Sequence, residues 1–126
     1  MAGEKILIVD DDKDQLIGLN IRLRANKYNV VIAHDAVMAV SVARKENPDL
    51  IILDIGLPAG DGFVVMERLR NLISLSHIPI IILTAREPTD NKERALSEGA
   101  YAFFQKPVDN HELLTAINNA LSGVSA

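Results

Sequence analysis

Five short apolar runs, spaced regularly along the chain, constrain the fold more than any other feature of the sequence. They comprise residues 6–9, 30–33, 50–53, 80–83 and 102–104, and they are rich in β-branched or aromatic side chains. Runs this short and this continuous predict strands that are buried on both faces. That pattern is typical of a parallel sheet covered by helices.

The segments between the runs have the period of a helix instead. Apolar residues recur there every three or four positions, although the stretch 91–98 is only weakly amphipathic. Strand and helix alternate five times, and parallel strands need crossover connections. The sequence therefore predicts an α/β, doubly wound (βα)5 fold with helices on both faces of a five-stranded sheet. The predicted core faces are Leu16, Leu19 and Leu23; Val37, Val40 and Ala43; Phe63, Met66 and Leu69; and Leu113, Leu114, Ile117 and Leu121.

Composition and charge narrow the class of protein. The chain has 126 residues, 48% of them apolar, which fits one compact domain. Its net charge is −4 and its Lys and Arg residues are scattered, which argues against direct binding to nucleic acid or to an anionic membrane. There is no cysteine for disulfides or thiolate metal sites, no signal-peptide pattern and no run of about 20 apolar residues. We expect a cytoplasmic single domain over residues 1–126, with a core from about 4 to 122 and no output domain.

Chemically versatile residues stand at the carboxyl ends of four predicted strands, the edge where doubly wound sheets place their sites. Residues 10–12 are three aspartates, and Asp54, Thr84 and Lys106 follow other strands. Three converging carboxylates need a counter-charge, which Mg²⁺ would supply, and the set suits in-line phosphoryl transfer with Asp54 as nucleophile. Each residue alone also has a structural interpretation, as a helix cap, a turn residue or a surface lysine.

Four segments resemble the response regulator receiver family, and the likeness covers essentially the whole chain. They are residues 6–12, residues 54–58 with Asp61 and Gly62, residues 83–85 and residues 105–107. The resemblance implies a flavodoxin-like sheet with strand order 2-1-3-4-5. It also implies that Asp54 accepts a phosphoryl group from the phosphohistidine of a sensor histidine kinase or a histidine phosphotransfer protein.

The resemblance assigns a role to the other site residues. Asp11 and Asp54 would bind Mg²⁺, or alternatively Mn²⁺, directly, with Asp10 acting through water and Gly56 through its backbone carbonyl. Lys106 would pair with a phosphoryl oxygen, and Thr84 would move to hydrogen-bond another. The resemblance further implies a cis peptide bond between Lys106 and Pro107, and a small residue, here Ala85, that leaves room for the phosphoryl group.

Two features depart from the best-known pattern of the family. In the family, an aromatic side chain three residues before the lysine changes rotamer as the threonine moves; here that residue is Phe103 rather than Tyr, so its ring offers no hydroxyl to a partner. The alternative is that Phe103 is an ordinary core residue. The positions two beyond Asp54 and two beyond Thr84 are Gly56 and Arg86. Glycine leaves an attacking water unhindered, whereas Arg86 would shield or pair with the phosphoryl group, so we expect the phosphoryl lifetime to depend on Arg86.

The family resemblance also implies what the domain does with its phosphoryl group. Phosphorylation would shift the surface formed by the fourth helix, the fifth strand and the fifth helix, where a downstream protein or a second receiver docks. The domain would be an enzyme only in catalysing its own phosphorylation and dephosphorylation. The main alternative is an interaction module that works without phosphorylation.

Two enzyme or ligand-binding classes fit the sequence poorly. A haloacid-dehalogenase-type phosphatase needs a second Asp where Gly56 stands. A flavodoxin-like nucleotide binder needs a phosphate loop where residues 10–12 are acidic.

Overall fold

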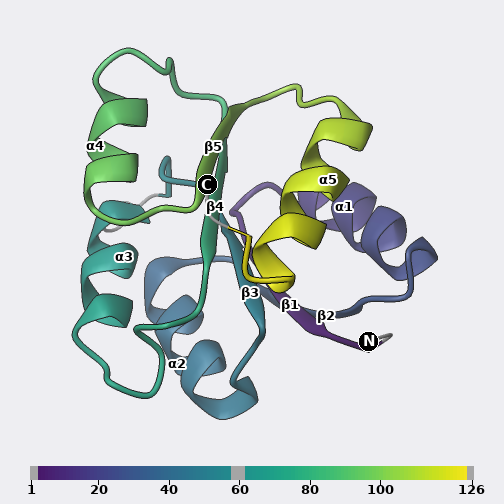
Figure 1. Ribbon diagram of the computed structural model, residues 1–126, viewed down its shortest axis with the longest axis horizontal. Coiled ribbons are helices and arrows are strands. Elements are labelled where there is room, and N and C mark those ends of the chain that lie inside the picture. Colours follow the sequence, from purple (N-terminus) through teal and green to yellow (C-terminus); the bar gives the residue numbers. More distant parts are fainter. Residues whose placement is uncertain (1–2, 58–61, 125–126) are drawn as a thin grey trace.

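The computed structural model describes residues 3–57 and 62–124 (Figure 1). Pro58 and Asp61, which contribute to the family resemblance, lie outside the described residues. In chain order the elements are β1 (Lys5–Val9), α1 (Lys13–Ala25), β2 (Asn29–Ala33), α2 (Ala36–Glu46), β3 (Leu50–Leu53), α3 (Gly62–Arg70), β4 (Ile80–Thr84), α4 (Asn91–Ser97), β5 (Ala102–Gln105) and α5 (Asn110–Leu121). Every predicted apolar run lies within one of these strands.

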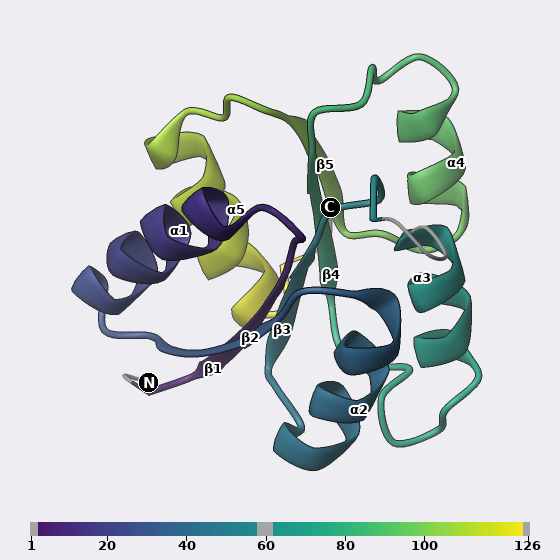
Figure 2. The ribbon, with the colours of Figure 1, turned by 180° about the vertical axis from the view of Figure 1, so that it is seen from behind.

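The five strands form one parallel sheet in the order β2-β1-β3-β4-β5. This confirms the predicted fold class and strand order. Helices α1 and α5 cover one face of the sheet, and α2, α3 and α4 cover the other (Figures 1 and 2). In the described part of the chain, no helix combines the length and apolar character that crossing a membrane requires.

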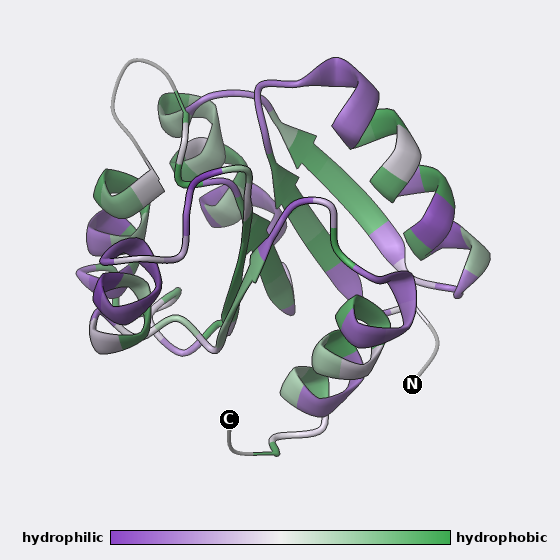
Figure 3. Ribbon diagram, turned by 90° about the horizontal axis from the view of Figure 1, so that it is seen from above, coloured by the Kyte–Doolittle hydropathy of each residue, from purple (hydrophilic) through white to green (hydrophobic). Residues whose placement is uncertain are grey.

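Successive residues of each strand belong to two separate hydrophobic cores, because side chains alternate between the two faces of a sheet. Ile6 and Ile8 pack with apolar residues of α1 and α5, whereas Leu7 and Val9 pack with those of α2, α3 and α4. The other strands divide in the same way. Both faces are therefore apolar, which explains the continuous hydrophobic runs in the sequence; the strands in Figure 3 are mostly green for this reason.

Aspartate side chains cap three of the five helices. Asp12, Asp35 and Asp109 are the N-caps of α1, α2 and α5, and each side chain accepts a hydrogen bond from a backbone N–H in the first turn. Such caps satisfy donors that have no partner within the helix. The structural interpretation of the acidic run 10–12 therefore holds for Asp12, which leaves Asp10 and Asp11 for other roles.

The predicted core faces of α1 and α3 are confirmed: Leu16, Leu19 and Leu23, and likewise Phe63, Met66 and Leu69, are buried. In α5, Leu113 and Ile117 are buried, while Leu114 and Leu121 are only partly so.

The prediction for α2 is confirmed for Ala43, which is buried, but it is wrong in the rotation of the helix about its axis. Val37 is 71% exposed and Val40 is half-buried, and the helix packs through Ala36, Ala39 and Ala43. Small alanine side chains let the helix backbone lie close to the sheet. Since α2 is apolar on most of its circumference, its sequence does not determine which face turns inward.

Helix α4 is short and lightly anchored, as its weak amphipathicity predicts. Ala95 is its only fully buried residue. The Arg94 guanidinium stacks 3.8 Å above the centre of the Phe63 ring of α3, and it also pairs with Glu98 at 2.8 Å. Gly99, which follows the helix, has a φ of +102°, a conformation that glycine adopts without strain.

Candidate functional site

The register of β1 against β3 brings the acidic residues together. Val9 pairs with Leu53, so Asp10 and Asp54 leave adjacent strands at the same edge of the sheet. The Asp54 N–H donates to the Val9 carbonyl at 3.0 Å, which extends the sheet by one more bond. Carboxylate oxygens of Asp10, Asp11 and Asp54 all lie within 4.8 Å of one another. Asp10 and Asp54 are buried, whereas Asp11 is exposed and opens the cluster to solvent.

Lys106 supplies a positive charge to this cluster from the end of β5. Its ammonium donates to Asp10 Oδ2 at 2.7 Å and to Asp54 Oδ2 at 3.1 Å, and only 14% of the side chain is exposed. The Lys106 backbone N–H donates to the Thr84 carbonyl at 2.7 Å. The Lys106–Pro107 peptide bond is cis.

The second oxygen of Asp54 is held by neutral donors. Oδ1 accepts from the Thr84 hydroxyl at 2.6 Å and from the Gly56 backbone N–H at 2.7 Å. Thr84 is completely buried as the last residue of β4, and its oxygen in turn accepts from the Arg86 N–H at 3.3 Å. The Asp54 carboxylate is therefore fixed at both oxygens by three different segments of the chain.

Burial and charge shift two ionisable groups in the cluster. Burial raises the pKa of Asp10, although the bonds from Lys106 and from the Asp12 N–H oppose that shift. Burial alone would lower the pKa of Lys106, but its hydrogen bond to Asp10 and the charges of Asp54 and Asp10 outweigh it, so the pKa of Lys106 is raised. Lys106 is consequently a fixed cation at neutral pH.

The donor set fits a hard divalent cation. Three carboxylates and one ammonium, −3 + 1, leave a formal charge of −2 in a largely buried cluster, and two positive charges would neutralise it. Carboxylate oxygens are the ligands that Mg²⁺ prefers, and Mg²⁺ usually retains several waters. The exposed carboxylate of Asp11 is the side from which a hydrated ion can approach. An acidic cluster of this kind is what the family resemblance implies for a Mg²⁺ site.

Gly56 and Arg86 lie together beside Asp54, as their positions in the sequence suggested. A Cβ atom added to Gly56 would lie 3.2 Å from Asp54 Oδ1 and 3.6 Å from Arg86 Nε. Arg86 is exposed, and its guanidinium lies close to the glycine. Ala85 is also exposed at this edge.

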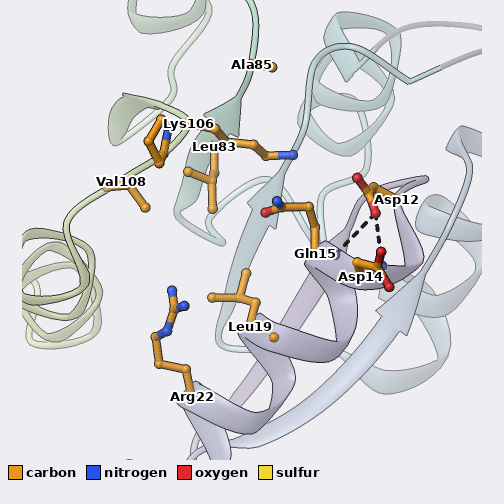
Figure 4. A pocket seen from close by; sticks show the side chains of 11 residues that line it. Asp12, Asp14, Gln15, Leu19, Arg22, Leu83, Ala85, Lys106 and Val108 are labelled. Atoms are coloured by element: carbon orange, nitrogen blue, oxygen red, sulfur yellow. Dashed lines mark hydrogen bonds between the residues drawn. The ribbon is translucent and has the colours of Figure 1, made fainter.

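Phe103 and a groove beside Lys106 complete the surroundings of the cluster. Phe103 is only 8% exposed and belongs to the core on the α2–α3–α4 side of the sheet. On the other side, a groove of about 540 Å³ runs between α1 and the segment after β5 (Figure 4). Its lining includes Gln15 and Arg22 of α1 and reaches Ala85 and Lys106.

Sequence reasoning missed two contacts in the site. It did not anticipate that Lys106 pairs most closely with Asp10, 96 residues away, because nothing in a linear pattern specifies which oxygen a long side chain reaches. It considered Gly56 for its carbonyl but not for the N–H that holds Asp54. A glycine two residues after an aspartate is a signal for such a turn, since Asp side chains commonly accept from the backbone two residues on.

Comparisons with known proteins agree with the fold and the site. Residues 6–118 match the response regulator receiver domain. The chain is 34% identical to the protein PilH of Pseudomonas aeruginosa over 119 residues, which cover 94% of this chain and 98% of PilH. A crystal structure of a CheY-like response regulator receiver domain protein from Methanospirillum hungatei has a TM-score of 0.89 at 30% identity, covering 96% of this chain and 95% of that one.

The chain belongs to the response regulator receiver family of two-component signal transduction. Members of this family are signalling modules rather than enzymes in the usual sense. Some relatives are much longer than this chain: the response regulator PleD of Caulobacter vibrioides is 33% identical over 115 residues, which are 91% of this chain but 25% of PleD.

Proposed function

We propose that this domain receives a phosphoryl group on Asp54 from the phosphohistidine of a sensor histidine kinase or a histidine phosphotransfer protein. The observation that carries the proposal is the environment of Asp54. Its carboxylate is buried, held by Thr84, Gly56 and Lys106, and surrounded by two further carboxylates suited to a divalent cation. In the same proposal the domain works in the cytoplasm, which fits a chain without cysteine and without a signal-peptide pattern.

In the transfer, a carboxylate oxygen of Asp54 attacks phosphorus as the P–N bond to the donor histidine breaks. The bonding electron pair leaves with the histidine nitrogen, and Asp54 becomes an acyl phosphate. Lys106, already 3.1 Å from Asp54 Oδ2, stabilises negative charge on the phosphoryl oxygens. The Thr84 hydroxyl leaves Asp54 Oδ1 and donates to a phosphoryl oxygen instead.

Mg²⁺, or alternatively Mn²⁺, would be held by Asp11 and Asp54 directly, by Asp10 through water and by the Gly56 carbonyl. When bound, the cation supplies charge neutralisation for the incoming phosphoryl group. The cation would share the cluster with Lys106, whose ammonium donates to Asp10 Oδ2 at 2.7 Å.

Loss of the phosphoryl group by hydrolysis is the second self-catalysed step, and we propose that Gly56 and Arg86 set its rate. Gly56 places no side chain beside Asp54, so a water can reach phosphorus. Arg86 Nε lies 3.6 Å from the position that a Gly56 Cβ would take, so its guanidinium is close enough to shield or pair with the phosphoryl group. An Arg86→Ala variant is therefore expected to change the dephosphorylation rate, and an unchanged rate would count against this role.

Phosphorylation is proposed to change the surface formed by α4, β5 and α5. A downstream protein or a second receiver would bind to this surface. A phosphoryl group adds nearly two negative charges at neutral pH, and it draws Thr84 away from its present partner. The lightly anchored α4 is the element most easily displaced, because Ala95 is its only fully buried residue. Phe103 would change rotamer as Thr84 moves.

The receiver is proposed to act as one domain over residues 1–126, with its core at about 4–122. The single five-stranded sheet supports this. The chain covers 98% of PilH but 25% of PleD, so its relatives include both proteins of this length and longer ones.

The test is phosphorylation by a small-molecule donor such as acetyl phosphate, with and without Mg²⁺, followed by intact mass. One added phosphoryl group that depends on the metal is expected. It should be absent in Asp54→Asn and present in Asp14→Asn, a matched control for an exposed aspartate of α1. If the protein gains nothing under conditions in which another receiver is phosphorylated, the proposal fails in favour of the phosphorylation-independent interaction module.

A further inference from the structure

A groove between α2 and α3 is separate from the acidic site. It has a volume of about 530 Å³ and lies on the face of the sheet that α2, α3 and α4 cover (Figure 2). None of its lining residues belongs to the acidic cluster or to the α4–β5–α5 surface. The lining residues are Val37, Val40, Ser41, Arg44 and Lys45 of α2 and Arg68 of α3.

The first notable property of this groove is its unpartnered apolar surface. Val37 and Val40 have the spacing of a helix core face, yet α2 buries its alanines instead. Val37 is left 71% exposed and Val40 half-buried. A single exposed valine is ordinary on a protein surface, but these two lie side by side, one turn apart, along the same groove.

The second property is positive charge without compensation. Arg44, Lys45 and Arg68 line the groove, and among the residues that the structure describes no acidic one does. Within residues 3–57 and 62–124, none of the three makes an ion pair or a side-chain hydrogen bond, and the neighbouring Glu46 is engaged by Lys5 at 3.0 Å. The chain as a whole carries a net charge of −4, so this basic groove contrasts with the rest of the molecule.

Helix-end electrostatics accounts for only part of this arrangement. Each cation lies in the last turn of its helix, where positive charge is favoured. That effect explains each position separately. It does not explain why cations from two helices border one groove together with two exposed valines.

We propose that the α2–α3 groove docks an acidic, amphipathic segment of a partner protein. Its carboxylates would pair with Arg44, Lys45 and Arg68, and its apolar side chains would cover Val37 and Val40. A small anion would pair with the cations but leave Val37 and Val40 exposed, whereas an amphipathic segment would also cover them. Because the groove shares no residue with the acidic site, docking is independent of Asp54 and goes beyond the proposed phosphorelay function.

The test is a titration of the ¹⁵N-labelled full chain, followed by amide chemical shifts, with three synthetic helical peptides of about 14 residues, or four turns. The first carries Leu every third or fourth position with Glu beside it, the second has Gln in place of each Glu, and the third has Gln in place of each Leu. The first peptide is expected to shift amides of α2 and α3 and to bind more tightly than the other two. Raising the salt concentration should weaken it.

Matched variants localise the binding. Arg44→Gln and Arg68→Gln should each weaken the first peptide about two- to five-fold, the usual effect of one exposed ion pair, and Val37→Asn should weaken it as well. Lys92→Gln, which removes the same charge from an exposed position on α4, should leave the affinity unchanged. Asp54→Asn should also bind normally, so failure of docking and failure of phosphorylation are distinguishable.

Several results would overturn the proposal. They are the absence of α2–α3 shifts at millimolar peptide, equal binding of all three peptides, and loss of affinity in Lys92→Gln to the same extent as in Arg44→Gln. Stronger occupation of the groove by inorganic triphosphate, or by vesicles of equal parts phosphatidylcholine and phosphatidylserine, would assign it to another ligand class. Shifts on raising the protein concentration alone would assign it to a second copy of this chain.

Discussion

Replacing Lys106 by methionine should destabilise the protein strongly when no divalent cation is present. Methionine has a similar length but removes the ammonium that contacts Asp10 at 2.7 Å and Asp54 at 3.1 Å. At an effective dielectric constant of about 20, two unit charges 4.8 Å apart, the largest separation of the cluster oxygens, repel by about 3.5 kcal/mol. Breaking a buried ion pair by removing one partner typically costs about 3–5 kcal/mol. We therefore expect a loss of about 3 kcal/mol in the free energy of unfolding at pH 7.

Urea unfolding in the presence of a chelator measures this loss. With an m-value of about 2 kcal/mol per M, the midpoint should fall by about 1.5 M, whereas Lys92→Met on α4 should change it little. Adding Mg²⁺ should stabilise Lys106→Met more than the parent protein, because the cluster then carries a charge of −3 rather than −2. The double variant Asp10→Asn with Lys106→Met should recover most of the loss, since it removes one of the facing charges.

The pH dependence follows from the direction of the Asp10 shift. Burial raises the pKa of Asp10 in the folded state, so its ionised form opposes folding at neutral pH, and that penalty is relieved as the pH falls through the folded pKa toward 3.8. Removing Lys106 raises this pKa further. The loss in free energy of unfolding that Lys106→Met causes should therefore shrink as the pH falls from 7 toward 4. A midpoint within about 0.3 M of the parent at pH 7, or a deficit that is constant with pH, would refute the argument.

Three further predictions concern how the site is supported, each measured by urea unfolding. Gly62→Ala should cost about 2 kcal/mol or more, because a Cβ there would lie 2.5 Å from the Ile55 Cα in the loop after β3. Gly18→Ala in α1 would place a Cβ with nothing within 4 Å and should stabilise by about 0.5–1 kcal/mol; equal effects of the two changes would contradict this. Asp12→Ala should lower the free energy of unfolding by about 1 kcal/mol, because the N-cap of α1 is lost, while the domain is still phosphorylated. Loss of phosphorylation in a folded variant would show that Asp12 has a role beyond capping. Arg94→Met should lower the free energy of unfolding by about 0.5–1 kcal/mol and speed amide hydrogen exchange in α4, because the contact with the Phe63 ring is lost. Unchanged exchange would mean that this contact does not restrain the helix.

The order of the elements and the position of the site could be predicted because both depend on local patterns. A strand buried on both faces is continuously apolar, and such runs located all five strands. Parallel strands place their carboxyl ends at one edge, so the residues that follow β1, β3 and β5, together with the last residue of β4, had to lie near one another. The acidic run, Asp54, Thr84 and Lys106 were therefore identifiable as one group before any contact was known.

Other features required the packed structure. The alternation of apolar residues in α2 allows several inward faces, and only close packing on the sheet selected Ala39 over Val37. The pairing of Lys106 with Asp10, across 96 residues, depends on the relative placement of β1 and β5 and on the path of a flexible side chain. The sequence by itself determined the fold and the chemistry available at one edge of the sheet, because periodicity and residue type are local. Which surfaces are left exposed, and which charges neutralise one another, depends on distances between segments that only tertiary packing fixes.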